Sequence, residues 1–151
     1  MAGDRPRSAP GMTPDEAGPH SGARGLLHHV ELWVPDLRRA VDQWGWLLGE
    51  LGYQDFQRWD AGRSWRLGPT YLVVEQSPAM TADPFDRLRP GLNHLAFHAG
   101  SPPTLDAMMS AAPQHDWAPL FDDRYPHAGG EQSYAGYLVN SDGFEIELVA
   151  G

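Results

Sequence analysis

The sequence predicts an α+β fold of two tandem βαβββ modules, whose eight strands curve into a half-barrel or barrel around a metal site. Three observations support this prediction. An alternating apolar run with a His near its start spans 26–36 and recurs at 91–100, so that His29 and His94 occupy equivalent positions. Each run breaks at Pro or Gly and is followed by apolar residues at helical spacing. Turn residues then divide the rest of each half into short alternating segments, which are typical of strands.

Composition narrows the classes of function. A chain of 151 residues with 41% hydrophobic residues can form one compact domain or two small modules around common cores. The absence of Cys excludes disulfides, thiolate nucleophiles and Cys-ligated zinc, and the absence of Lys excludes Schiff-base chemistry. A net charge of −9 argues against nucleic acid and anionic membranes as partners, which leaves a small-molecule substrate. Residues 1–25 are polar and rich in Pro and Gly, so we expect a disordered leader, no secretory signal and a cytoplasmic protein.

The first module is predicted over 26–76. Its opening strand covers 26–34, and Asp36 after Pro35 is the predicted N-cap of a helix. Apolar residues at helical spacing continue that helix to Leu51, and Gly52 is the residue expected to end it. Three short strands separated by Gly- and Pro-containing turns complete the module, at 54–59, 63–67 and 71–76.

A connector with no clear periodicity, 77–90, leads to the second module at 91–151. After the repeated His-containing run, a shorter helix is predicted over 104–112. A long loop at 122–132 contains Gly129-Gly130, and loops of this kind often cover a site. The remaining strands are predicted at 117–121, 133–139 and 144–149.

Strand parity places polar side chains on one shared face. If the apolar residues of each strand pack beneath the helices, the alternate residues face a common concave side. An offset of 72 residues between the modules aligns Glu75 with Glu147, whereas Glu145 is expected at the rim or in solvent. Imidazole and carboxylate groups from four strand positions form a site suited to Zn, Ni, Co, Mn or Fe. The four predicted side chains are those of His29, His94, Glu75 and Glu147.

These segments resemble the vicinal oxygen chelate superfamily of glyoxalases, bleomycin-resistance proteins and dioxygenases. The matching features are the His-containing strand, WGWLL at 44–48 and DGFEIEL at 142–148. The resemblance covers about 26–149 and points to a bacterial glyoxalase-like branch of that family. It implies paired βαβββ units around a divalent metal, with ligand roles for His29, His94, Glu147 and Glu75.

The resemblance also implies a mechanism, in which neighbouring substrate oxygens bind the metal and an enolate is stabilised. The leading hypothesis is a metal-dependent glyoxalase-like lyase or isomerase, with Glu147 and Glu75 as catalytic residues. An Fe(II) extradiol-type dioxygenase using His29, His94 and Glu147 is the second hypothesis. A metal-free drug-binding or resistance protein is the third. Glu75 is either a fourth ligand or a charge at the end of a strand, because a one-residue slip would turn it away.

Further residues are predicted to line a substrate pocket. Arg66 could pair with a substrate carboxylate or phosphate. The connector at 77–90 allows the modules to close on each other within one chain or to exchange between two chains, and the resemblance implies a homodimer. The predicted substrate-binding residues are Trp33, Arg66, Tyr71, His98, His127 and Tyr134.

Overall fold

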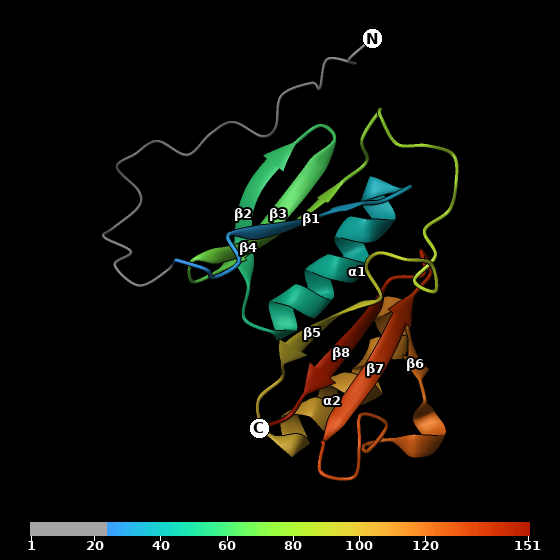
Figure 1. Cartoon of the computed structure of the whole chain (residues 1–151). Coiled ribbons are helices and arrows are strands. Elements are labelled where there is room, and N and C mark those ends of the chain that lie inside the picture. Colours follow the sequence, from blue (N-terminus) through green and yellow to red (C-terminus); the bar gives the residue numbers. More distant parts are fainter. Residues whose placement is uncertain (1–23) are drawn as a thin grey trace.

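The computed structural model describes residues 24–151, in which two modules share the same order of elements (Figure 1). The predicted leader, 1–25, lies outside the described residues except for its last two positions. In the described part of the chain, no helix is long and apolar enough to cross a membrane.

Both modules are βαβββ units, as predicted. The first sheet has the order β1-β4-β3-β2 and the second the order β5-β8-β7-β6, and in each sheet the first strand pairs in parallel with the last. The first module contains β1 (His29–Trp33), α1 (Leu37–Glu50), β2 (Gln54–Trp59), β3 (Gly62–Leu67) and β4 (Thr70–Glu75). The second contains β5 (His94–His98), α2 (Pro102–Ala111), β6 (Trp117–Leu120), β7 (Ala135–Asn140) and β8 (Glu145–Val149).

Helix α1 begins and ends where the sequence predicts. The Asp36 carboxylate accepts a hydrogen bond from the backbone N–H of Arg39 at 2.9 Å, which caps the first turn. Gly52 has a φ of +87°, a left-handed conformation that glycine adopts without a steric penalty, and the Tyr53 N–H closes the helix on the Leu48 carbonyl at 2.8 Å. The buried stripe of α1 consists of Ala40, Gln43, Trp44, Leu47 and Leu48.

Strand β1 is shorter than predicted because its parallel neighbour β4 starts only at Thr70. His29 pairs with Tyr71, and the His28 carbonyl accepts a hydrogen bond from the Tyr71 N–H at 3.2 Å, so residues 26 and 27 lie beyond the start of β4. Within β1 the predicted alternation is confirmed, since Leu32 is buried and His29 is exposed.

The eight strands form two separate sheets, and within residues 24–151 they do not close into a barrel. Helix α1 lies between the sheets (Figure 1), and Trp44 of α1 packs edge-to-face on Trp117 of β6 with ring centroids 5.1 Å apart. The Trp117 indole N–H also donates to the Gln43 carbonyl at 3.0 Å. The helix-covered faces of both sheets therefore share one core, and the prediction of a barrel within the chain is not confirmed.

We call the side of each sheet that faces away from this core its open face. Neither open face is covered by the other module, because Trp33 of the first is 44% exposed and His98 of the second is exposed. The open face of the first sheet carries His29, Glu31, Trp33, Tyr71 and Glu75, and that of the second carries His94, Ala96, His98, Tyr137 and Glu147.

Candidate functional site

His94 and Glu147 meet on the open face of the second sheet. The His94 Nε2 atom lies 3.3 Å from Glu147 Oε2. The other carboxylate oxygen, Glu147 Oε1, accepts a hydrogen bond from the Tyr137 hydroxyl at 2.8 Å. Burial, and next the hydrogen bond to Glu147, raise the pKa of Tyr137 to about 12, so its hydroxyl remains a donor at neutral pH. Tyr137 therefore holds the carboxylate with Oε2 directed at the imidazole.

His29 lies on the open face of the first sheet. Its ring stacks on Tyr71 at a centroid distance of 4.8 Å and an interplanar angle of 6°. Its Nδ1 atom is 2.9 Å from Nδ1 of His28, which leaves Nε2 of His29 without a partner in the described chain. His29 is exposed, so this nitrogen is accessible to a ligand from outside the module.

The strand register contradicts the predicted equivalence of Glu75 and Glu147. Glu147 pairs with Ala96, two residues after His94, and the matching partner of Glu31, two residues after His29, is Val73. Val73 therefore occupies the position in the first module that Glu147 occupies in the second.

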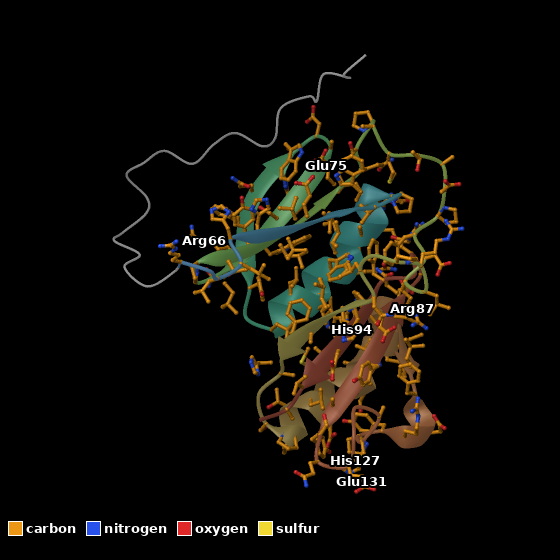
Figure 2. All side chains as sticks on the ribbon, viewed as in Figure 1. Arg66, Glu75, Arg87, His94, His127 and Glu131 are labelled. Carbon is orange, nitrogen blue, oxygen red and sulfur yellow. The ribbon has the colours of Figure 1, made fainter. Side chains whose placement is uncertain are left out.

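Glu75 lies at the C-terminal end of β4. It pairs with Trp33, four residues beyond the His29 row, which is about 13 Å at the usual rise of a strand. Figure 2 shows Glu75 and Arg66 at opposite ends of the first sheet, and Arg66 belongs to the His29 row through its pairing with Tyr71. Burial, and then the nearby Glu31 carboxylate, raise the pKa of Glu75. Glu75 is thus separated from His29 along the sheet, and a shared metal would have to bridge this distance.

Arg66 faces the open side, as predicted. Its guanidinium lies 5.1 Å from the centre of the Phe56 ring, and its Nε donates to the Gly68 carbonyl at 2.8 Å. A β-bulge between Asp55 and Gln57 brings Phe56 against Tyr71, with centroids 5.3 Å apart. A cavity of about 450 Å³ adjoins Arg66 and Phe56. The His29 row therefore ends in a positioned guanidinium beside an open cavity.

Tyr134 lies on the other side of the second sheet, contrary to the prediction. Its hydroxyl donates to Asp106 of α2 at 2.9 Å, and the Tyr125 hydroxyl donates to the same carboxylate. The alternation that turns Tyr137 and Ala135 to the open face turns Tyr134 toward α2. This hydrogen bond to Asp106 is the main cause that raises the pKa of Tyr134.

The long loop reaches the site, in line with the expectation that it covers one. A Cβ added at Gly129 would lie 3.0 Å from the Tyr137 hydroxyl oxygen and 3.5 Å from Glu147 Oε1. His127, two residues earlier, is exposed and its Nδ1 lies 2.8 Å from the Ser133 carbonyl. The loop backbone therefore passes directly against the carboxylate of Glu147, and His127 is held at the loop's turn.

Three residues near the site were not predicted. Glu145, expected at the rim, is buried and forms an ion pair with Arg87 at 2.6 Å. Arg87 lies in the connector, where no periodicity indicates its direction. Asn93 contacts His94 through its side chain, and its place directly before His94 is the only sequence signal of this contact. Tyr137 is the third residue. Its position directly opposite Glu147 is known only from the pairing of β7 with β8.

The described part of one chain brings two of the four predicted metal ligands together. Among residues 24–151, no three or more His, Asp or Glu side chains come close enough to hold a metal ion. His94 and Glu147 form a pair, and His29 lies on the other sheet.

Comparison with known proteins shows the family of this chain. Residues 28–137 match the sequence profile of the Glyoxalase/Bleomycin resistance protein/Dioxygenase superfamily. The chain is 42% identical to the uncharacterised protein YqjT of Bacillus subtilis (strain 168) over 125 residues, which are 82% of this chain and 98% of YqjT.

Two crystal structures have the same fold. A glyoxalase candidate from Bacillus halodurans is 42% identical, with a TM-score of 0.82 over 85% of this chain and 98% of that chain. A glyoxalase/bleomycin resistance protein from Albidiferax ferrireducens T118 is 20% identical, with a TM-score of 0.67 over 84% and 99% of the two chains. The chain belongs to the glyoxalase/bleomycin resistance protein/dioxygenase superfamily.

Proposed function

We propose that this protein is a metal-dependent enzyme that acts on a small molecule with two neighbouring oxygen atoms. The observation that carries the proposal is the convergence of His94 Nε2 and Glu147 Oε2 at 3.3 Å. Both are atoms that bind divalent metals, and a second group holds the other polar atom of each side chain. The donor set therefore fits a metal ion between them.

The third ligand in this proposal is His29 of a second copy of the chain. Within one chain neither open face is covered by the other module, but the first open face of one copy can cover the second open face of another. In a symmetric dimer this pairing occurs twice and creates two equivalent sites. The large exposed apolar side chains Trp33 and Phe121 support such a contact, since Phe121 packs on Tyr137 of the second open face with centroids 5.4 Å apart.

His29, His94 and Glu147 would hold a divalent metal, which would supply Lewis acidity toward two neighbouring substrate oxygens and an adjacent C–H group. Tyr137 keeps the Glu147 carboxylate oriented, and the loop at Gly129 limits the access of water to it. Arg66 lies in the His29 row beside a cavity, which supports it as the proposed partner of an anionic end of the substrate. This arrangement supports a glyoxalase-like lyase or isomerase in which Glu147 is the nearest carboxylate to serve as the base.

A second candidate reaction follows from Val73. Because the apolar Val73 stands at the position in the first module that Glu147 occupies in the second, the proposed set is two His and one carboxylate. That set is typical of non-haem Fe(II) oxygenases, which supports an extradiol-type dioxygenase.

The proposal is tested by metal analysis of the untagged protein, before and after treatment with a chelator. We expect close to one divalent metal ion per chain, removable by the chelator and restored by one metal of the series Zn, Ni, Co, Mn and Fe. Iron with metal-dependent oxygen uptake on catechols would favour the dioxygenase, and another metal without oxygen uptake the lyase or isomerase. A protein that binds none of these metals would contradict both and leave a metal-free binding protein.

A further inference from the structure

The side chain of Asn93 connects His94 to the connector that joins the modules. The Asn93 Oδ1 atom lies 2.7 Å from His94 Nδ1, and the Asn93 Nδ2 group donates to the Arg87 carbonyl at 3.0 Å. Figure 2 shows Arg87 beside His94, at the start of β5. The Asn93 amide is therefore held by the Arg87 carbonyl through its Nδ2 group and contacts the His94 imidazole through its Oδ1 atom.

These two contacts determine the direction of the Asn93 amide. The Arg87 carbonyl is only an acceptor, so the group that faces it must be the NH₂ of Asn93. The amide oxygen then faces His94 Nδ1, and a neutral imidazole can satisfy this oxygen only by carrying its proton on Nδ1. The lone pair of the ring is consequently on Nε2, the atom 3.3 Å from Glu147 Oε2.

Two side-chain contacts hold the segment that carries the Arg87 carbonyl. The Arg87 guanidinium forms the 2.6 Å ion pair with Glu145, whose side chain is only 3% exposed. Glu145 in turn lies directly opposite His94 in the pairing of β5 with β8. Two residues before Arg87, Phe85 stacks on Phe144 at 4.3 Å with an interplanar angle of 16°. Two side-chain contacts thus anchor the segment 85–87, which ends in the carbonyl that Asn93 binds, on the second module.

We propose that Asn93 is a positioning residue for the metal site, which fixes His94 in the tautomer with a free Nε2 lone pair. This inference rests on the proposed metal-dependent function. It also assigns the connector a role, because the Arg87 carbonyl keeps the amide of Asn93 from turning its NH₂ toward the imidazole. Nε2 and Glu147 Oε2 then face each other as two acceptors, which a metal cation placed between them would satisfy.

The test compares Asn93→Ala with Asn93→Asp, and uses the exposed Gln132→Ala as the matched control for removal of a side-chain amide. Asn93→Ala is expected to weaken metal affinity by about 10–100-fold, as is usual for loss of a partner behind a metal-binding His. Asn93→Asp keeps an acceptor for the Nδ1 proton and is expected to bind within a few-fold of the wild type. Gln132→Ala is expected to bind as the wild type does. Equal losses in both Asn93 variants would overturn the inference.

The tautomer itself is measured in the metal-free protein by ¹⁵N NMR of the imidazole, at a pH where His is neutral, with His94→Ala to assign the signals. We expect the Nδ1–H form in the wild type and a mixture with Nε2–H in Asn93→Ala. An unchanged tautomer together with unchanged metal affinity in Asn93→Ala would contradict the inference and leave the proposed function intact. If the wild type binds no metal, the proposed function fails, and the tautomer measurement still decides whether Asn93 orients His94.

Discussion

Replacing Glu147 with Ala is expected to lower the affinity for a divalent metal by more than about 100-fold, because loss of a partner behind a ligand already costs about 10–100-fold. Glu147 supplies the carboxylate beside His94 Nε2, and no other Asp or Glu in the described chain forms a pair with this atom. The measurement is a titration of the chelator-treated protein with Zn and Fe, followed by calorimetry or competition with a chromophoric chelator.

The matched control for this variant is Glu75→Ala. It removes the same type of side chain from the equivalent strand of the first module, two residues beyond the position of Val73. We expect its metal affinity to equal that of the wild type. A loss of affinity in Glu75→Ala as large as that in Glu147→Ala would show that Glu75 is a ligand after all and that the three-ligand proposal is wrong.

The largest expected effect on stability comes from Trp117→Ala. Trp117 is completely buried between the modules, packs on Trp44 and donates to the Gln43 carbonyl. Deleting a buried Trp side chain typically costs about 3–5 kcal/mol, because packing is lost and the cavity fills only in part. The free energy of unfolding, measured by urea denaturation at fixed protein concentration, is expected to fall by this amount.

Trp117→Phe separates packing from hydrogen bonding. It keeps an aromatic ring against Trp44 but removes the N–H group, which contributes about 0.5–1.5 kcal/mol for a typical hydrogen bond. We expect its loss of stability to be less than half of that in Trp117→Ala. A loss below about 1 kcal/mol in Trp117→Ala would show that the contact between α1 and the second module does not hold the modules together.

The sequence was informative wherever a local pattern decides the structure. The recurrence of His29 at His94 predicts the two modules, and alternation in β1 correctly separates buried Leu32 from exposed His29. Asp36 and Gly52 mark the ends of α1 because capping depends on the residues at the ends themselves.

The position of Glu75 could not be predicted in this way. Side chains alternate with a period of two, so moving a strand by two residues leaves every side chain on the same face. An offset of 72 and the observed pairing therefore give the same parity, but they place Glu75 and Val73 differently relative to His29. Only the hydrogen-bonded pairing of β1 with β4 distinguishes the two.

Contacts between distant segments were also hidden. Whether the sheets close on each other depends on how α1 packs against β6, through residues such as Gln43 and Trp117 that are far apart in the chain. The connector has no periodicity, so its approach to the second sheet through Arg87 and Glu145 leaves no pattern in the sequence.

We propose that each metal site combines His29 of one copy with His94 and Glu147 of another. The most direct test joins His29→Ala and Glu147→Ala chains in one dimer, by coexpression with two different tags and purification through both. In such a dimer one site carries both defects and the other carries neither. We expect about half of the wild-type metal content for the mixed dimer and close to none for either variant alone. Mixed dimers that bind no more metal than the separate variants would contradict a site shared between two chains.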